Sequence, residues 1–458
     1  MTPAKIKILR RLKKILPSEI IFDPRKLADY SGDKWFAVHQ PDAVALPRST
    51  QSVSKILRFA NQNKIPVTAR GGGYGYVGGC VPVRGGIVIS TERMNRILEI
   101  NANDFVAIVQ PGVNTQKFQE AVERKKLFYP PDPASRAHNF IGGNIATNAG
   151  GPRCLKYGVT RDYILGLEVV LANGDIVRVG GRTHKNKTGF DLTKLFVGSE
   201  GLLGIVTEAA LKLIPLPPFR ATLAVGFNSI RNAVGALQAI LAAGFLPSAL
   251  ELADEFTLAA AAEYTRNHRL GVCKAHLIAE LDGQKNSVRG ELPQVEKIIR
   301  RFKPLFVERG FGNTGCEKIW QIRREFSTAL KVTGLRKLNE DIVVPRGKLE
   351  TLFQFTARLQ KKFDLPIACF GHAGDGNIHV NVMVDEKNPR VRKNCDKVLD
   401  ELFRWILKNK GAITGEHGIG LAKKRWWPQA VSPEVRELHR ALKQMLDPNG
   451  ILNPGKFV

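Results

Sequence analysis

Two glycine-rich segments in the last quarter of the chain hold the side chains best suited to chemistry. The first contains His372 and His379, and the second contains Glu416 followed directly by His417. Imidazole and carboxylate groups bind divalent cations, and an adjacent histidine can act as a base near neutral pH. Only nine histidines occur in 458 residues, and three of them lie in these two segments. The pattern therefore predicts a metal site, whereas a glycine-rich hairpin with incidental surface histidines is the simpler alternative.

The segments around the two histidines predict the strands that must position them. Residues 365–370 are apolar and end at a glycine, as expected of a buried strand. Residues 378–384 alternate polar and apolar, which is typical of a half-buried strand and places His379 and Asn381 on one face. The glycines between the strands allow positive φ angles, so that the His372 and His379 rings can meet at one point.

Composition limits the classes of protein to consider. The chain has 458 residues of which 43 % are apolar, enough for two or three domains with large cores. Its 69 basic and 42 acidic residues give a net charge of +27, which suits an anionic substrate, an anionic membrane surface or nucleic acid. The six cysteines form no CxxC pair, so no iron-sulfur or zinc-ribbon framework is visible and a reducing cytoplasm is expected.

Two segments bear on membrane contact. Residues 233–250 are apolar but are interrupted by Gly244 and Pro247, so that a helix followed by a strand is predicted there. Residues 5–16 predict a basic amphipathic helix with Ile6, Leu9, Leu12 and Leu16 on one side. Such a helix could lie on anionic lipid as a peripheral contact, but packing against its own domain is the favoured interpretation.

A GxGxxG sequence at 73–78 follows a predicted strand at 65–70, as a dinucleotide-binding fingerprint would. That fingerprint requires a helix directly afterwards, and the next element is instead a strand at 87–90. The sequence thus argues against a Rossmann fold, although consecutive glycines can still offer backbone N–H groups to phosphates. The other elements predicted in this half are a strand at 42–47, a helix at 50–63, a strand at 105–110 and a helix at 114–125.

Two further glycine-rich segments suggest a flat ligand lying against main chain. Residues 141–151 are expected to form a loop with few side chains larger than a methyl group or a carboxamide. Residues 198–206 form a third tight glycine segment that enters a strand. One such loop would be an ordinary turn, but three together indicate a binding site.

Several motifs in this order resemble the FAD-binding domain of the vanillyl-alcohol-oxidase superfamily, and they lie at 69–73, 130–135, 142–144, 148–151, 156–158, 198–201 and 204–208. The segments 371–379, 415–420 and 447–456 are similar to the branch that holds D-lactate dehydrogenase, D-2-hydroxyglutarate dehydrogenase and the flavin subunit of glycolate oxidase. The resemblance extends from Tyr30 to Lys456. It is specific for FAD-linked oxidoreductases of D-2-hydroxy acids as a class, and not for one acid.

The resemblance implies an α+β protein with an FAD-binding domain of two subdomains and a C-terminal cap domain. The implied divisions are a helical segment at 1–40, the FAD-binding domain at 41–217, a substrate and cap domain with the metal site at 218–420, and a segment at 421–458 that returns to the FAD domain. The residues implied to bind FAD are Arg70, Gly71, Gly72, Gly73, Tyr74, Pro131, Asp132, Ser135, Gly142, Gly143, Asn144, Asn148, Gly150, Gly151, Glu200, Ile205, Val206 and Asn453. Tyr74 departs from the Thr or Ser of the family, and the lack of a histidine in such a loop favours non-covalent FAD.

The same resemblance implies how a 2-hydroxy acid is oxidised. A divalent cation, Zn or alternatively Mn or Fe, would be held by His372, His379 and Glu416 and would chelate the α-hydroxyl and a carboxylate oxygen. His417 would accept the hydroxyl proton while a hydride moves from Cα to flavin N5. The candidates for binding the substrate are Arg323, as a carboxylate clamp, with Asn381 and Lys337.

The route by which electrons leave the flavin is a separate question. An acceptor protein or a quinone is expected, and a separate iron-sulfur subunit is one form that the partner could take. Two other functions are considered. An FAD oxidase of another alcohol or of a sugar lactone would not need the metal ligands. A nucleic-acid-binding protein would explain the charge, but the basic residues are dispersed and no binding module is recognisable.

Overall fold

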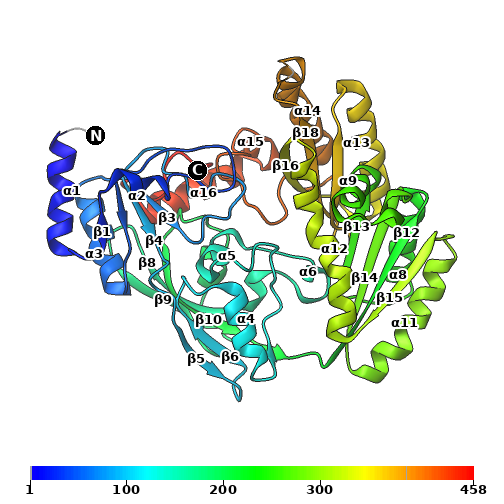
Figure 1. Ribbon diagram of the computed structural model, residues 1–458. Helices are drawn as coiled ribbons and strands as arrows, with labels where there is room; N and C mark the ends of the chain where they lie inside the picture. Colours follow the sequence, from blue (N-terminus) through cyan, green and yellow to red (C-terminus); the bar gives the residue numbers. More distant parts are fainter. Residues whose placement is uncertain (1–2, 388) are drawn as a thin grey trace. The chain divides into compact units, whose positions relative to one another are not determined.

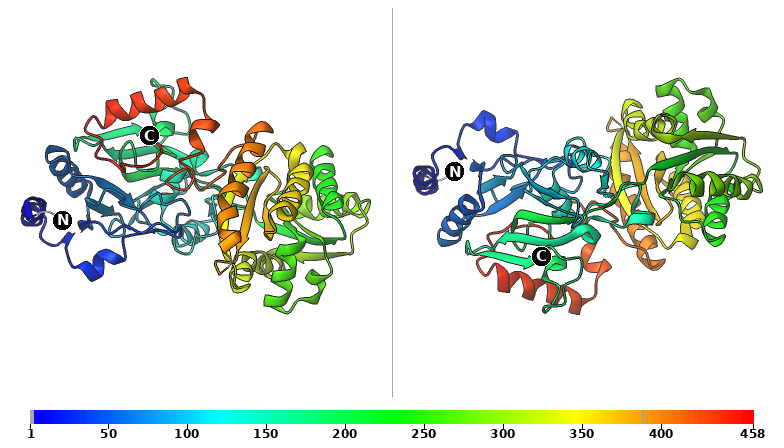
Figure 2. Two further views of the ribbon diagram at one scale, coloured as in Figure 1. Left: turned by 90° about the horizontal axis from the view of Figure 1, so that it is seen from above. Right: turned by 90° about the horizontal axis from the view of Figure 1, so that it is seen from below.

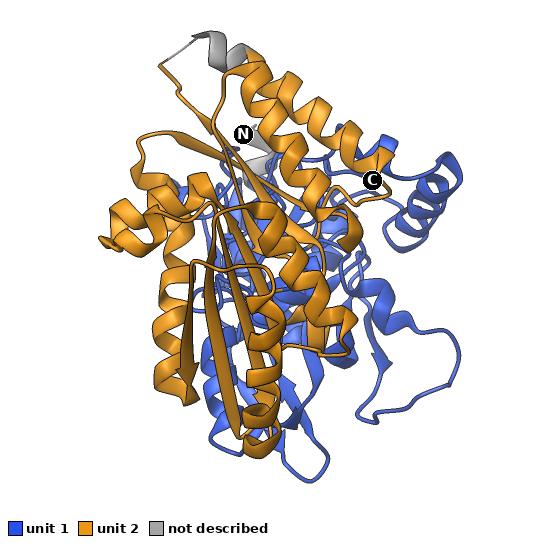
Figure 3. Cartoon of the chain, turned by 90° about the vertical axis from the view of Figure 1, so that its right-hand side faces the viewer, with its two compact units in different colours: residues 1–150, 159–216, 416–458 blue, residues 151–158, 217–415 orange. Residues whose placement is uncertain are grey.

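The computed structural model describes residues 3–387 and 389–458, and it divides into two compact units (Figure 3). Unit 1 comprises Met1–Gly150, Val159–Leu216 and Glu416–Val458, and unit 2 comprises Gly151–Gly158 and Pro217–Gly415. Each unit thus contains segments that are far apart in the sequence. The predicted domains at 41–217 and 218–420 stay predictions.

Unit 1 begins with a small sheet of order β1-β2-β4-β3, formed by Ile20–Ile21, Ala43–Ala45, Ile87–Ser90 and Val67–Arg70. Strands β2, β4 and β3 run parallel, and helix α3 (Thr50–Gln62) connects β2 to β3. Ser49 begins α3 because its side chain accepts a hydrogen bond from the Ser52 N–H. Between β3 and β4 there are only turns. The prediction that no helix follows GxGxxG is therefore confirmed, and the Rossmann fold is excluded.

The second sheet of unit 1 is antiparallel and has the order β5-β6-β10-β8-β9. Its strands are Ile97–Asn101, Val106–Val109, Ile205–Lys212, Ile164–Val170 and Ile176–Gly180. A short pair, β7 (Leu127–Phe128) and β11 (Ile214–Pro215), lies apart from it. The remaining short elements among these strands are α2 (Pro24–Ala28), α4 (Thr115–Glu123), α5 (Ile141–Thr147), the 3-10 helix Thr160–Tyr163 and α7 (Leu192–Phe196).

The end of the chain returns to unit 1. It forms helices α15 (Trp427–Ala430) and α16 (Pro433–Leu446), drawn in red in Figures 1 and 2. After α16, Leu452 forms a parallel bridge with Val67, and the Asn453 N–H donates to the Val67 carbonyl at 2.6 Å. The last residues therefore extend the small sheet beside β3.

Helix α1 (Pro3–Ile15) packs on unit 1. Leu9, Leu12 and Leu16 are buried in a cluster with residues of α3 and of the small sheet. This confirms the favoured interpretation for these three side chains, whereas the side chain of Ile6 lies outside the described residues. Within residues 3–387 and 389–458, no helix combines the length and apolar character that a membrane crossing requires.

Unit 2 is built on one antiparallel sheet of order β15-β12-β14-β13-β17-β18-β16 (Figure 1). In sheet order the strands are Phe306–Phe311, Phe219–Phe227, Ala275–Gly283, Ala249–Asp254, Ile367–His372, Asn377–Val384 and Arg336–Val343. Strands β13 and β17 are neighbours although more than a hundred residues separate them. The centre of the sheet therefore joins an early and a late part of the unit's sequence.

Helices cover this sheet on its two faces. Helices α9 (Glu255–Thr265) and α12 (Gly312–Val332) share a buried cluster with Ala253, Phe370 and Met383 of the sheet. Helices α8 (Ile230–Ala242), α11 (Lys285–Arg300), α13 (Leu349–Phe363) and α14 (Pro389–Lys408) also pack on strands of the sheet and on one another. The shorter helices are α6 (Cys154–Tyr157), α10 (His268–Gly271) and the 3-10 helix Arg346–Lys348.

Two predictions about local structure were wrong. Residues 141–147 form helix α5 and not a loop. A glycine is needed at position 142 of this helix, because a Cβ there would lie 2.6 Å from the Pro111 Cβ, which is too close. Strand β18 is buried along its whole length and not on one face, because helices cover the sheet where the alternation alone suggested solvent.

Candidate active site and cofactor-binding loops

Two neighbouring strands place the predicted histidine ligands together. His372 is the last residue of β17, His379 lies on β18, and the register pairs His379 with Phe370. Residues two apart on a strand share a face, so both imidazoles project from the face that α9 and α12 cover. Their rings are 5.6 Å apart and nearly perpendicular. Gly376 closes the turn between them with a φ of +89°, and a Cβ there would lie 2.1 Å from the Val344 carbonyl oxygen.

Glu416 completes the predicted group of ligands. His372, His379 and Glu416 each offer one ligand atom, and these atoms all lie within 4.8 Å of one another. Glu416 is joined to Gly415, whose N–H donates to Asp341 Oδ2 at 2.8 Å. Asp341 is fully buried on β16, where the register pairs it with His379. A buried carboxylate thus holds the backbone that leads into Glu416.

The three donor groups fit a divalent cation. Two imidazoles and one carboxylate are a known set for zinc in catalytic sites, where a position stays open for water or substrate. His372 and His379 are buried and Glu416 is partly exposed, which would leave the third ligand on the open side. The donors are therefore suitable in type, number and separation.

A buried carboxylate that the sequence did not reveal supports His372. Glu251 of β13 accepts a hydrogen bond from His372 Nδ1 at 2.5 Å and one from Arg323 Nε at 2.6 Å. Burial opposes ionisation of Glu251, but His372 and Arg323 outweigh it and lower the pKa of this carboxyl to about 2. A carboxylate on Nδ1 leaves Nε2 of the same ring to face a metal. The one signal in the sequence was an acidic residue between the apolar residues Leu250 and Leu252.

The three predicted substrate-binding residues lie in unit 2. The guanidinium of Arg323 pairs with Glu251 and lies over the Phe370 ring at 4.8 Å. The amide of Asn381 donates to the carbonyls of Ala368 and His379, each at 3.1 Å. Their roles towards a substrate stay predictions.

Lys337 is the third of these residues. It lies on β16, paired in register with Met383, and its Nζ donates to Ser327 Oγ at 2.7 Å. Burial, with a smaller contribution from the nearby Lys331 charge, lowers the pKa of Lys337 to about 8. Ser327 itself was not predicted, because nothing in its local sequence marks it.

The predicted base, His417, belongs to unit 1. Its ring stacks on that of Tyr76 with 5.3 Å between centroids and an angle of 25°. Tyr76 lies in the GxGxxG segment, so this segment contacts the predicted catalytic residue. Neither the motif nor its spacing indicated that contact.

The glycine-rich segments of unit 1 lie against one another. A Cβ on Gly71 would lie 3.3 Å from the backbone of Gly143, and one on Gly72 would lie 2.6 Å from the His138 carbonyl oxygen. At Gly143 nothing lies within 4 Å of the Cβ position. The 70–74 loop and the start of α5 therefore approach each other closely at positions where side chains are missing, which suits a ligand that contacts main chain.

Other predicted FAD-binding residues hold this arrangement together from within. Arg70 donates to the Gly32 carbonyl at 2.5 Å, and the Tyr74 ring stacks on His138 at 4.8 Å. The Asn144 amide donates to Thr115 Oγ1, and the Asn148 side chain accepts from the Arg161 N–H. Eight more predicted FAD-binding residues also lie in unit 1, and their roles stay predictions: Gly73, Pro131, Asp132, Ser135, Gly150, Ile205, Val206 and Asn453.

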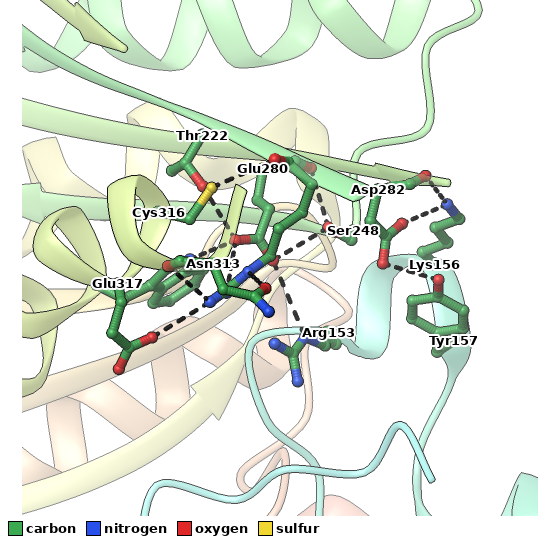
Figure 4. A network of polar contacts seen from close by, with 12 residues as sticks. Arg153, Lys156, Tyr157, Thr222, Ser248, Glu280, Asp282, Asn313, Cys316 and Glu317 are labelled. Carbon is green, nitrogen blue, oxygen red and sulfur yellow. Dashed lines mark hydrogen bonds and ion pairs between the residues drawn. The ribbon is translucent and has the colours of Figure 1, made fainter. Parts of the chain in front are cut away.

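Immediately after Gly150, residues 151–158 are fastened to the sheet of unit 2 (Figure 4). Lys156 Nζ lies 2.5 Å from Asp282 Oδ1, and the Tyr157 hydroxyl donates to Asp282 Oδ2 at 2.8 Å. Arg153 lies 4.0 Å from the fully buried Glu280. Strand β14 thus supplies two carboxylates that fix the segment following the predicted flavin loop.

Comparisons with known families cover most of the chain. Residues 41–180 match the family described as FAD binding domain, and residues 216–457 match the family described as FAD linked oxidases, C-terminal domain. Glycolate oxidase subunit GlcD of Bacillus subtilis is 41 % identical over 417 residues, which are 91 % of this chain and 89 % of that protein. D-lactate dehydrogenase of Anaerostipes hadrus is 31 % identical over 466 residues, which cover 98 % of this chain and 97 % of that protein.

Solved structures with little sequence identity share the fold. p-Cresol methylhydroxylase with substrate bound has a TM-score of 0.81 at 20 % identity, covering 100 % of this chain and 97 % of the other. 4-Ethylphenol oxidase from Gulosibacter chungangensis has a TM-score of 0.80, also at 20 % identity, covering 100 % of this chain and 98 % of the other. These likenesses confirm the predicted α+β fold of the vanillyl-alcohol-oxidase type.

Proposed function

Because this chain belongs to the family of FAD-linked oxidases, we propose that it oxidises a small D-2-hydroxy acid to the 2-oxo acid, with FAD as the hydride acceptor. The chain is an FAD-linked oxidoreductase, and what we propose is which substrate it oxidises and that it binds a metal. The relatives named glycolate oxidase subunit and D-lactate dehydrogenase support an acid of the glycolate or D-lactate type. An acid of the 2-hydroxyglutarate type is included because of the motif resemblance alone. The observation that carries the proposal is the convergence of His372, His379 and Glu416 within 4.8 Å.

The three ligands would bind Zn, Mn or Fe. When bound, the cation would supply Lewis acidity to the α-hydroxyl, lowering its pKa. Glu251 keeps the Nδ1 proton of His372 in place, so that Nε2 offers its lone pair to the cation. Asp341 holds the backbone before Glu416. These residues orient the ligands before any substrate arrives.

Proton removal and carboxylate binding are assigned to separate side chains. His417 accepts the hydroxyl proton, and its ring is held by the Tyr76 stack. Arg323 and Lys337 supply positive charge for the substrate carboxylate. Asn381, on the same strand as His379, is assigned a hydrogen bond to the substrate. The cofactor, when bound at the glycine-rich loops of unit 1, supplies hydride acceptance at N5.

Electron transfer out of the flavin requires a partner. We propose a separate acceptor protein or a quinone, and the word subunit in the names of the GlcD relatives supports an assembly that could include an iron-sulfur protein. A cytoplasmic location, with peripheral membrane contact as an alternative, belongs to the same proposal.

An anaerobic reduction experiment tests the proposed reaction. Purified holoenzyme is mixed with single D- and L-2-hydroxy acids, and loss of the oxidised flavin absorbance is recorded. We expect bleaching by D-isomers or glycolate, and a loss of that bleaching after metal removal or in the His379→Ala variant. Equal bleaching by both enantiomers, or reduction that is indifferent to metal, would favour an oxidase of another alcohol or a sugar lactone.

A further inference from the structure

The geometry points to Glu200 as a positioning residue that holds the backbone next to Glu416 and His417. Glu200 lies in the glycine segment 198–204 of unit 1, and its carboxylate is directed at residues 418–420. Resemblance placed Glu200 among the FAD-binding residues. Its side chain instead contacts the loop that follows Glu416. The positioning role rests on the proposed metal site.

Both oxygens of Glu200 accept hydrogen bonds from one short piece of backbone. Oε1 accepts from the Ile419 N–H at 2.7 Å, and Oε2 accepts from the Gly420 N–H at 2.8 Å. Two charge-assisted bonds to consecutive amides fix the loop in position and in orientation. The carboxylate therefore acts on the backbone only three and four residues after Glu416.

The sequence of the loop is adapted to this contact. Gly418 has a φ of +86°, and a Cβ there would lie 2.7 Å from Glu200 Oε1. Leu421 then continues the attachment, because its N–H donates to the Val77 carbonyl at 2.7 Å. The loop that starts with Glu416 is thus tied at 419, 420 and 421 to two different glycine segments.

Glu200 itself is held firmly. It has a φ of +50°, which is costly for a residue with a side chain and is retained where the surroundings determine it. Its carbonyl accepts a hydrogen bond from the Asn453 amide at 2.8 Å. Burial raises the pKa of Glu200 above its usual range, and the Ile419 and Gly420 N–H groups, with the buried Lys456 and Lys423, act in the opposite direction. A buried carboxylate that is hydrogen-bonded through both of its oxygens can act as a rigid anchor.

Metal affinity and FAD retention separate this role from that of a flavin ligand. We expect Glu200→Gln to weaken binding of Zn²⁺ about 10–100-fold, as loss of an outer support does in metal sites, while FAD release changes less than about threefold. Zn²⁺ affinity is measured on chelator-treated holoenzyme by competition with a metal-binding dye. Glu168→Gln removes another buried carboxylate of unit 1, bonded to Thr50, Thr207 and Arg178, and should leave Zn²⁺ affinity unchanged.

A second measurement does not depend on metal. Hydrogen exchange of a peptide containing 417–422 should become faster in Glu200→Gln than in the parent, because the Ile419 and Gly420 amides lose a charged acceptor. Unchanged exchange in this peptide would overturn the inference. So would loss of FAD with Zn²⁺ affinity intact, since the carboxylate would then serve the flavin.

Two glycine variants give a matched pair. Gly418→Ala places a methyl group against the Glu200 carboxylate, and Gly189→Ala has the same φ of +86° with nothing within 4 Å of the new Cβ. We expect only the first to weaken Zn²⁺ binding and to speed exchange at 417–422. Equal behaviour of the two would show that the contact with Glu200 is unimportant.

Glu416→Gln distinguishes the inference from the function on which it rests. If this variant binds Zn²⁺ as tightly as the parent protein, the proposed metal site fails. If it binds weakly while Glu200→Gln binds normally, the metal site stands and the positioning role of Glu200 is wrong.

Discussion

Nδ1 of His372 lies 2.5 Å from Oε1 of Glu251, and both side chains are buried. The second oxygen of Glu251 accepts from Arg323 at 2.6 Å, so one carboxylate joins a predicted metal ligand to a predicted substrate clamp. Any change in Glu251 is therefore expected to alter both functions.

Glu251→Gln should lower metal affinity about 10–100-fold, because the amide is a weaker acceptor for Nδ1–H and no longer fixes the imidazole tautomer. The measurement is Zn²⁺ competition with a chelating dye. Glu280→Gln is the control, because Glu280 is equally buried on the neighbouring strand and contacts Arg220 and Trp320, away from the three predicted ligands. Comparable losses in both variants would contradict the tautomer argument.

Lys337→Met should make the protein more stable at pH 7 and poorer at binding substrate. The pKa of Lys337 falls from 10.5 to about 8 on folding, so between these values the unfolded chain binds more protons and stability rises with pH. Removing the buried cation should raise the free energy of unfolding by on the order of 2–3 kcal/mol at pH 7. That gain should shrink by pH 9.5.

Urea unfolding of Lys337→Met at the two pH values measures the gain, and the KM for the best hydroxy acid should rise at least tenfold if Lys337 contacts the carboxylate. A stabilised variant with normal KM would remove Lys337 from the binding site.

His276→Leu should reduce the loss of stability in mild acid. Burial lowers the pKa of His276 from 6.5 to about 4, so between pH 6.5 and 4 the unfolded chain takes up a proton that the folded protein does not. Folded stability therefore falls as pH falls through this window, by roughly 2–3 kcal/mol for this residue. Unfolding free energies at pH 7.5 and 4.5 should differ less in the variant. His268→Leu, an exposed histidine of the same unit, should retain the parent dependence.

Asp282→Asn should loosen residues 151–158, because Lys156 loses its ion pair and Tyr157 its charged acceptor. We expect a destabilisation of about 1–3 kcal/mol and faster hydrogen exchange in a peptide that spans this segment. Glu317→Gln changes an exposed carboxylate at the edge of the same network and should cost less than about 1 kcal/mol. Similar exchange in the two variants would argue against a specific fastening by Asp282.

The sequence predicted well what depends on short spacing and poorly what depends on strand order. His372 and His379 are separated by one turn, so their meeting followed from glycines and strand periodicity. Glu251 and Asp341 come from β13 and β16, which flank β17 and β18 only because the sheet order departs from chain order. No local pattern carries that information. Helix α5 was missed because helix propensity disfavours glycine, whereas Gly142 is required by its close packing on Pro111.

The bridge between Leu452 and Val67 also constrains how the protein is made. Strand β3 pairs with β4 on one side, but its other edge is met by Leu452, which is made far later, so this edge of the small sheet stays open until residues 451–453 have been synthesised. An expressed fragment that stops near residue 216 would expose the unpaired edge of β3 and the apolar surface that Ile451 and Leu452 cover in the full chain. Such a fragment should aggregate, and adding residues 416–458 as a separate peptide should rescue its solubility.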